Sequence, residues 1–522
     1  MSSQRLITKQ SLPLVQKFAY SVGHVLNDLT ASMWFTYMII YFHQVKKFNN
    51  ALAGDLVLIG QISDAVFTPF IGYESDRVKG CCNMGKRKTW HFIGTICVMC
   101  SFPFLFLGCI TCDNAPDWSQ FIYYAPFVVI FQFGWASTQI NHLSLIPDLT
   151  DCANERVGLN GYRYAFTVLS NMMVYGIAWL LFDVHQTSDA SEQLGPADSS
   201  RFQMLVLIVV SIGILFSIIF HIGVRERAIE NNPESLNDSA SMLTIEKSTM
   251  KQVVMSWKCW LKEHQFYQVA VIYMSTRLVV NISQVYLPMY LTETLKLDKD
   301  SIAIIPLIVY VSGFVTSLLM KYVNAAVGRK VTYLIGIGFQ IGACAAFYFL
   351  PTGSKLVYGA AILSGVGGST MLVTSLAMTA DLIGENTESG AFVYGAMSFT
   401  DKLSNGAAIA LIQQLHPCGA GCCPLCISYY RHILTFVPGG MSVIAGIALV
   451  TLLPQVLGTR RKKAVALLKQ VTENGTRREI TQDDSYDSDE QEPLLRDCIE
   501  NSVKAPSFSG VPEGKDIITD AT

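Results

Sequence analysis

Polar and ionisable side chains recur at helical spacing inside apolar stretches of this sequence. Asp64 lies in the apolar part of "GQISDAVFTPFIGYESDRVKGCCNMGKRK", with Gln61 three residues before it and Thr68 four residues after it. Residues three or four apart share one face of a helix. An ionisable group at membrane depth costs about 2.5–3.5 kcal/mol, so it is expected to face a cavity or a partner. Asp64 is therefore predicted to bind a proton, a metal cation or a substrate amine, or to pair with an internal Lys or Arg.

Four further stripes have the same spacing. They are Ser21, His24, Asp28 and Ser32; Gln132, Trp135, Gln139 and His142; Arg277, Asn281 and Gln284; and Ser398, Lys402 and Asn405. Together, these polar faces predict a water-accessible central cavity. The alternative is that they only hold helices together, by hydrogen bonds of about 0.6 kcal/mol each. This alternative is suited to the neutral residues. His24 and His142 would in that case be ordinary core histidines with satisfied hydrogen bonds. Asp401 points away from Lys402 and is expected to pair locally or to face another helix.

The composition is that of a membrane protein. Of the 522 residues, 51% are hydrophobic and 15% are charged, whereas soluble domains are about one quarter charged. Crossing the hydrocarbon core takes about 20 apolar residues in a helix. The sequence predicts twelve such helices, at 17–42, 50–73, 89–111, 120–146, 161–184, 203–223, 266–292, 301–322, 330–350, 356–383, 391–414 and 431–457.

Positive charge predicts the orientation of these helices. Lys and Arg are more frequent in the N-terminus and the even-to-odd loops than in the opposite loops, and cytosolic loops are the ones enriched in them. Both termini are therefore expected in the cytosol. The predicted organisation is an N-terminus (1–16), a six-helix half (17–223), a polar cytosolic linker (224–265), a second six-helix half (266–457) and a disordered, charged cytosolic tail (458–522).

Cysteines gather in two loops that are predicted to face away from the cytosol. They are Cys109 and Cys112 in the 3–4 loop, and Cys418, Cys422, Cys423 and Cys426 in the 11–12 loop. In an oxidising compartment such clusters form disulfides. A zinc site and free thiols are the alternatives for the 11–12 loop.

The predicted halves share a weak repeat, because "GYESDR…GKRK" follows the second helix and "KYVNAAVGRK" follows the eighth. With "SDAVFTP", "ADLIGENTESG" and "DKLSNG", these segments resemble the glycoside-pentoside-hexuronide:cation symporter branch of the major facilitator superfamily. The resemblance implies an all-α fold of twelve transmembrane helices with a charged cytosolic latch between the halves. The latch residues that it implies are Gly72, Asp76, Arg77, Gly85, Lys86, Arg87, Gly328 and Arg329.

The same resemblance implies a set of substrate- or cation-binding residues. They are Asp28, Asp64, Arg163 and Lys402, to which the stripes add Gln139, Arg277 and Asn281. Thr68 and Gln139 stand where the family has carboxylates. Sodium coupling and sugar recognition are therefore left open.

Other segments are similar to a vertebrate branch of the superfamily that is found in lysosomes and melanosomes and is associated with cysteine import and pigmentation. They are "SVGHVLNDLTASMWFTY", "VIFQFGWASTQINHLSLIPDL" and "TSLAMTADLIG". This resemblance implies transport of cysteine from the cytosol to the lumen by alternating access. Asp28, Arg277 and Lys402 would complement a zwitterion, and Trp34 and Trp135 would border its thiol or simply pack.

Two other functions compete with this interpretation. The first is a cation-coupled symporter of a sugar or another small organic solute, and the second is a receptor-like or scaffold protein that has kept the fold. Proton antiport, proton symport and facilitated flow remain open as modes of coupling. The sequence contains no nucleotide-binding or hydrolytic motif, so we expect no enzyme, no cofactor, no resident metal and no nucleic-acid partner.

The tail contains a sorting motif. In "DSYDSDEQEPLLRD", Glu490 is followed after three residues by Leu494 and Leu495. This resembles the acidic dileucine signal that clathrin adaptors read. The motif predicts delivery to lysosomes and melanosomes, with some protein at the plasma membrane.

Overall fold

The computed structural model describes residues 12–77, 80, 84–109, 115–150, 153–183, 194–225, 257–384, 390–418, 424–455 and 457. These residues form two compact units. The larger unit takes the described residues of 12–225, 267–382 and 394–455, and the smaller unit takes those of 257–266, 383–393 and 457. In the smaller unit, the rings of Phe266 and Phe392 stack with their centroids 6.4 Å apart.

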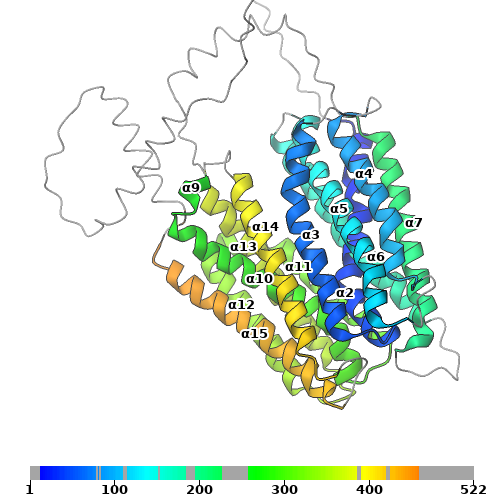
Figure 1. Ribbon diagram of the computed structural model, residues 1–522. Coiled ribbons are helices and arrows are strands. Elements are labelled where there is room, and N and C mark those ends of the chain that lie inside the picture. Colours follow the sequence, from blue (N-terminus) through cyan, green and yellow to red (C-terminus); the bar gives the residue numbers. More distant parts are fainter. Residues whose placement is uncertain are drawn as a thin grey trace, which may run out of the picture. The chain divides into compact units, whose positions relative to one another are not determined.

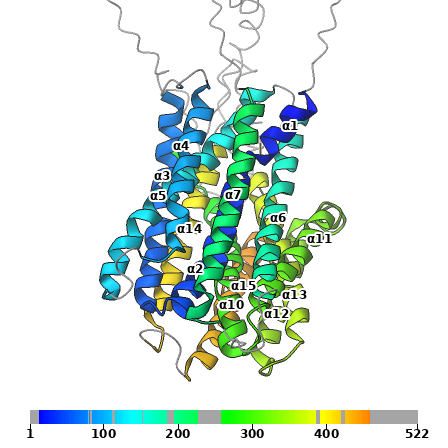
Figure 2. The ribbon, with the colours of Figure 1, turned by 90° about the vertical axis from the view of Figure 1, so that its right-hand side faces the viewer.

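The N-terminal half of the larger unit begins with one helical segment in four pieces: α1 (Leu14–Ser21), the 3₁₀ turn η1 (Val22–His24), α2 (Val25–Ile40) and the π-helix η2 (Tyr41–Val45). There follow α3 (Asn50–Arg77), α4 (Lys86–Ser101), η3 (Phe102–Leu105), α5 (Asp117–Leu149), α6 (Ala153–Asp183), η4 (Pro196–Asp198) and α7 (Ser199–Gly223). Helix α2 packs against α6 and α7, which lie beside it in Figure 2.

The C-terminal half repeats this order. After the short α9 (Trp257–Trp260) come α10 (His264–Met289), the π-helix η6 (Tyr290–Thr294), α11 (Ser301–Val327), α12 (Arg329–Phe349), α13 (Val357–Ile383), α14 (Gly390–Gln414) and α15 (Cys426–Leu452). Figure 1 shows α12 beside α15, and α14 toward α3 of the N-terminal half.

The all-α fold is confirmed, and each of the twelve predicted ranges contains a helical segment. Boundaries differ by a few residues. The last helix begins at Cys426 and ends at Leu452, earlier than the predicted 431–457, because a more polar first turn continues the same helix. Among the described residues, eight helices are long and apolar enough to cross a membrane. Twelve crossings and cytosolic termini therefore stay predictions.

The first helical segment of each half ends in the same way. Both segments close with a π-helix that starts at a tyrosine, Tyr41 or Tyr290. Each tyrosine hydroxyl donates to a carbonyl oxygen two helices further on, that of Phe106 (2.7 Å) or Phe347 (2.5 Å). Lys47 and Lys296 then both have φ of 53°, which is uncommon for residues other than glycine. This agreement shows a structural repeat that the sequence barely displays.

The third helix of each half also begins in the same way. Gly85 (φ 87°) and Gly328 (φ 80°) stand at the N-caps of α4 and α12, in a conformation that favours glycine. Thr89 and Thr332, both four residues later, donate their hydroxyls back to these glycine carbonyls. The matching "GKRK" and "VGRK" segments therefore encode one corner twice.

A lysine in each of these corners caps the last helix of its own half. Lys88 Nζ donates to the carbonyls of His221 and Val224 at the end of α7. Lys330 Nζ donates to those of Leu452, Leu453 and Gln455 at the end of α15. Helix C-termini carry unpaired carbonyls and partial negative charge, so an ammonium is favourable there.

Polar contacts join the two halves at one end of the bundle. We call "terminal face" the end where α1 and α4 begin and α7 and α15 end, and "opposite face" the end with η2, η4 and η6. At the opposite face Lys299 Nζ lies 3.4 Å from the Asp198 carboxylate, and both side chains are buried. Gln44 donates to Thr292 (2.7 Å) and Glu293 (2.5 Å). These contacts close the opposite face of the bundle.

Candidate functional site

The two halves place opposite charges at the same position of their first helices. Asp28 in α2 lies thirteen residues before Tyr41, and Arg277 in α10 lies thirteen residues before Tyr290. Because these tyrosines begin the repeated π-helices, Asp28 and Arg277 are structurally equivalent. The repeat therefore gives the site a negative half and a positive half.

Asp28 is 8% exposed, and both of its carboxylate oxygens are engaged. Oδ1 lies 2.9 Å from Nδ1 of His24, one helical turn earlier. Oδ2 accepts a hydrogen bond of 2.9 Å from the Thr167 hydroxyl of α6. A carboxylate with two such partners keeps its orientation.

The opposite charge, Arg277, is held by the C-terminal half. Its Nε donates to Oδ2 of Asp401 in α14 at 2.9 Å, and Asn405 donates to Oδ1 of the same carboxylate at 2.6 Å. The Arg277 side chain is 30% exposed. Asp401 therefore faces another helix, one of the two arrangements expected for it. A guanidinium has five N–H donors, so Arg277 keeps donor capacity beyond the one that binds Asp401.

A second buried ion pair joins the two halves directly. Lys402 Nζ of α14 lies 2.7 Å from Oδ1 of Asp64 in α3, and their side chains are 11% and 5% exposed. The Thr68 hydroxyl donates to Asp64 at 3.1 Å and accepts from Lys402 at 2.9 Å. The ammonium also lies 5.7 Å from the ring centroid of Trp135, close enough for a cation–π interaction. Asp64 thus binds an internal ammonium in this conformation.

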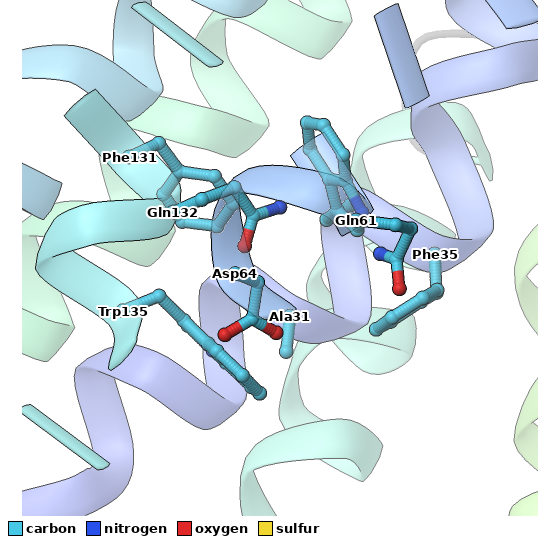
Figure 3. Close-up of a pocket in the computed structure, with 8 residues that line it drawn as sticks. Ala31, Phe35, Gln61, Asp64, Phe131, Gln132 and Trp135 are labelled. Atoms are coloured by element: carbon cyan, nitrogen blue, oxygen red, sulfur yellow. The ribbon is translucent and has the colours of Figure 1, made fainter. Parts of the chain in front are cut away.

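A pocket opens beside Asp64 and is shown in Figure 3. The Asp64 carboxylate lies near the indole of Trp135, with the Gln132 amide above it in this view. The lining residues are Ala31, Trp34, Phe35, Gln61, Asp64, Phe131, Gln132 and Trp135. Half of these residues are aromatic, and the free volume of about 10 Å³ holds about one water molecule. A solute the size of an amino acid would therefore need a wider conformation of this pocket.

A hydrogen-bonded group of neutral side chains also connects the halves near this pocket. Gln284 of α10 donates to the Thr36 hydroxyl of α2 at 3.0 Å. Thr36 is also bonded to the Tyr175 hydroxyl of α6 at 2.7 Å. The ring centroids of Tyr175 and Tyr310 lie 5.2 Å apart. Gln284 belongs to a predicted stripe, but Thr36, Tyr175 and Tyr310 were not singled out from the sequence.

The three remaining predicted site residues differ in their surroundings. Asn281 is buried one turn from Arg277, at the position equivalent to Ser32. Gln139 is partly buried. The buried Nε of Arg163 has no hydrogen-bond partner among the described residues, although its charge acts on His24 and His142. Their roles in binding stay predictions.

The charged residues of this candidate site that the structure describes include equal numbers of acidic and basic groups. They are the carboxylates of Asp28, Asp64 and Asp401 and the basic groups of Arg163, Arg277 and Lys402. Charge inside a membrane protein is costly unless it is paired. A solute without net charge can enter this arrangement without upsetting the balance.

The arginines of the predicted latch contact neighbours in their own halves. Arg77 lies 3.8 Å from Glu74 and 4.9 Å from the centroid of the Tyr73 ring. Arg87 donates to the Ser75 hydroxyl at 2.7 Å. Arg329 pairs with Asp381 of α13. These contacts brace α3, α4, α12 and α13, and a latch between the halves stays a prediction. The side chain of Asp76 lies outside the described residues.

Some of the predicted cysteine residues, and all residues of the predicted sorting motif, lie outside the described residues. Cys109, Cys418 and Cys426 are each disulfide-bonded, whereas Cys112, Cys422 and Cys423 lie outside the described residues, so the pairing stays open. His43, His416 and Cys426 place ligand atoms within 4.8 Å of one another, but a disulfide sulfur is not the thiolate that a metal requires. Glu490, Leu494 and Leu495 also lie outside the described residues.

Comparison with known proteins agrees with this architecture. Residues 19–415 match the family of MFS/sugar transport proteins. The chain is 50% identical over 454 residues to human "Major facilitator superfamily domain-containing protein 12", covering 85% of this chain and 94% of that protein. It is 23% identical over 438 residues to an uncharacterized symporter of Synechocystis, covering 72% and 79%. The inward open xylose transporter XylE of E. coli superposes with a TM-score of 0.59 at 14% identity, covering 83% of this chain and 94% of that one.

Proposed function

We propose that this chain, which belongs to the MFS/sugar transport protein family, moves cysteine from the cytosol into lysosomes and melanosomes by alternating access. As a major facilitator superfamily transporter, it is a multi-pass membrane protein. The observation that carries the proposed substrate is the pair of opposite charges, Asp28 and Arg277, at equivalent positions of the two halves.

This arrangement suits a zwitterion. The substrate carboxylate would take the remaining donors of Arg277, and its ammonium would bind at Asp28. Because these residues belong to different halves, one bound molecule bridges both halves and favours closure around itself. Binding energy used in this way drives the conformational change. A solute that carries only one of the two charged groups cannot bridge them.

The pocket beside Asp64 supports the choice of a small thiol. Trp34, Phe131 and Trp135 offer aromatic faces and edges. Contacts of divalent sulfur with aromatic rings contribute about 0.3–1.5 kcal/mol. We propose that the cysteine side chain points toward these rings. A longer side chain would meet the Asp64–Lys402 pair, so the pocket also selects for size.

Direction and location rest on the sequence. The terminal face contains the basic corners at Gly85 and Gly328, and positive charge marks the cytosolic side. We therefore propose that the terminal face is cytosolic and the opposite face luminal. The sorting motif at Glu490, Leu494 and Leu495 would direct the protein to lysosomes and melanosomes through clathrin adaptors.

Uptake of labelled cysteine into proteoliposomes that contain the full-length protein tests this function. We expect saturable uptake that unlabelled cysteine inhibits. Cysteamine, which lacks the carboxylate, and 3-mercaptopropionate, which lacks the ammonium, should inhibit it at least about tenfold more weakly, because each loses a charged hydrogen bond of about 1.5–3 kcal/mol. Equal inhibition by all three compounds would contradict the bridging of the two halves.

A cation-coupled sugar symporter is the second candidate. The amides of Gln61 and Gln132 beside Trp34 and Trp135 would bind hydroxyl groups and stack against a sugar ring. The same proteoliposomes distinguish the two functions. Uptake of labelled xylose that a sodium or proton gradient accelerates, without uptake of cysteine, would favour the symporter.

A further inference from the structure

Four of the nine histidines of the chain gather in the N-terminal half. They come from four segments: His24 from η1, His91 from α4, His142 from α5 and His221 from α7. The ring centroids of His24 and His142 lie 5.7 Å apart, those of His142 and His91 5.9 Å, and those of His91 and His221 5.0 Å. His24, His91 and His142 are at most 3% exposed. We call these residues the histidine cluster.

Hydrogen-bond partners determine which nitrogen of each ring carries a proton. A backbone carbonyl only accepts, so Nε2 of His142, 2.8 Å from the Tyr20 oxygen, is protonated. Nε2 of His91, 3.1 Å from the Gly23 oxygen, is protonated for the same reason. His24 faces the Asp28 carboxylate through Nδ1 at 2.9 Å, so this nitrogen donates.

This assignment leaves two bare nitrogens at the inner end of the cluster. They are Nε2 of His24 and Nδ1 of His142, both buried and both without a hydrogen-bond partner among the described residues. An unsatisfied buried polar atom destabilises the folded protein. His91 differs, because its Nδ1 lies 3.1 Å from Nε2 of His221. Nδ1 of His221, at the other end of the cluster, is also buried without a partner among the described residues. The two bare nitrogens on neighbouring rings are therefore those of His24 and His142.

Surrounding charges distinguish the two ends of the cluster. The Asp28 carboxylate is bonded to His24 and would pair with a positive charge on that ring. The positive charge of Arg163 in α6 acts against a positive charge on His24. Arg163 also acts on His142, as do His24 and His91, and the phenol ring of Tyr20 stacks on His142 with the centroids 4.3 Å apart. At the other end, His91 and His221 lie near the ammonium of Lys88, which repels a proton. Among the described residues, a carboxylate is thus bonded to the cluster only at His24.

We propose that Asp28, His24 and His142 form a binding site for one proton, separate from the Asp64–Lys402 pair. The proton adds to Nε2 of His24 and makes an imidazolium, which the Asp28 carboxylate neutralises. The added N–H then has the bare Nδ1 of His142 as an acceptor, directly or through one water. One proton thereby provides a partner for both nitrogens.

Nitrogen NMR of the full-length protein, labelled at its histidine side chains and held in lipid nanodiscs, tests the site without any substrate. Between about pH 8 and about pH 5, where histidine charge changes are expected, we expect one buried imidazolium signal to appear. It should be lost in His24→Gln and shifted to lower pH in Asp28→Asn. His221→Gln is the matched control, since His221 contacts the cluster at the Lys88 end, and it should keep the signal.

Two results would overturn the proposal. One is the absence of any buried imidazolium down to about pH 5, and the other is a signal that survives His24→Gln but disappears in His221→Gln. If His24→Gln does not purify as a monodisperse protein, His142→Gln replaces it. That variant removes the bare acceptor and should lower the pH at which the signal appears.

Use of this proton in transport rests on the proposed function. In proteoliposomes with a pH dye inside, cysteine flux should change the internal pH in the wild type and in His221→Gln, and at least about tenfold less in His24→Gln. Absence of cysteine uptake by the wild type overturns the proposed function and leaves the NMR result intact. Wild-type cysteine uptake without any pH change overturns the coupling role alone.

Discussion

The two halves share a backbone but differ in what they bury. Tyr41 and Tyr290 begin the same π-helix, and Gly85 and Gly328 make the same corner. In the interior, the N-terminal half has a carboxylate and the histidine cluster. The C-terminal half has at the equivalent position of its first helix Arg277, bound to Asp401. A duplicated scaffold therefore supplies the geometry, and divergence of its buried side chains supplies the polarity of the site.

The largest effect is expected at the ion pair that joins the halves. Asp64→Asn should reduce transport about 10- to 100-fold, because a hydrogen bond between charged groups contributes about 1.5–3 kcal/mol. Lys402 would then be left without its counter-ion, so expression and monodispersity must be measured first. Asp55→Asn, in the same helix but bonded to Gln414, is the control. Normal flux in Asp64→Asn would show that the halves do not need this charge.

The proposed roles of Asp28 and Arg277 should be distinguishable with analogues that lack one charged group of cysteine. Asp28→Asn should weaken inhibition by cysteine and by cysteamine about tenfold, and leave inhibition by 3-mercaptopropionate unchanged. Arg277→Gln should weaken inhibition by cysteine and by 3-mercaptopropionate and leave inhibition by cysteamine unchanged, because it removes the proposed partner of the carboxylate. Inhibition constants in proteoliposomes measure both. If the two variants respond alike to both analogues, the assignment of one charge to each half is wrong.

The contacts at the opposite face should control the conformational equilibrium. Lys299→Gln removes one of two basic partners of the Asp198 carboxylate, because Arg201 of the same half stays 2.5 Å from it. The cost should therefore be smaller than that of breaking a buried pair outright, which is about 3–5 kcal/mol. The substitution should shift a 1:99 population without inverting it, which would take about 5.5 kcal/mol. Spin labels at Trp118 and Leu425, which are 62% and 61% exposed, should then report a larger share of long distances.

Lys296→Gln is the matched control for this experiment. Lys296 lies 3.3 Å from Glu293 in the same half, and its side chain is 36% exposed. The Lys296→Gln variant should have the same distance distribution as the wild type. An unchanged distribution in Lys299→Gln would mean that this ion pair does not hold the halves closed.

The repeated lysine caps offer a direct comparison of the halves. Lys88→Met and Lys330→Met each remove the ammonium that caps the last helix of its half, although the two lysines stand three and two residues after the corner glycines. A cation at a helix C-terminus stabilises it by about 0.3–1 kcal/mol, or about 2 kcal/mol where partly buried. Lys88 is 7% exposed, so Lys88→Met should lower the thermal midpoint in detergent more than Lys330→Met does. The opposite order would show that burial of the ammonium does not determine the size of the effect.

The smallest effect concerns a partly exposed ion pair of the N-terminal half, Lys17 and Glu155. Hydrogen bonds from Lys17 and Thr150 hold the pKa of Glu155 below its usual value. A lowered folded-state pKa stabilises the protein above the unfolded pKa, and this contribution is lost as the pH falls through the folded value. Glu155→Gln should slightly lower the thermal midpoint at neutral pH and leave it unchanged in acid. A deficit that persists in acid would point to lost packing instead.

Local sequence determined the helices and the faces on which the polar residues lie. Apolar length and a three-to-four residue period place Asp28, Asp64, Arg277 and Lys402 on buried polar faces, because both signals belong to a single helix. The corner glycines could be located in the same way. The match did not predict that Gly85 and Gly328 have the same backbone conformation, because so short a sequence match does not determine φ.

Only the tertiary structure decided which of these side chains meet. Asp64 and Lys402 are separated by 338 positions in the chain, and no local pattern distinguishes Lys402 from Arg277 as the partner of Asp64. The sequence favours ordinary core histidines at His24 and His142. It gives no signal for His91 and His221, because each stands alone in its own helix. They form a cluster only where α5 and α7 pack against η1 and His91 of α4 bonds to the Gly23 carbonyl, and a contact between helices depends on packing that no single segment encodes.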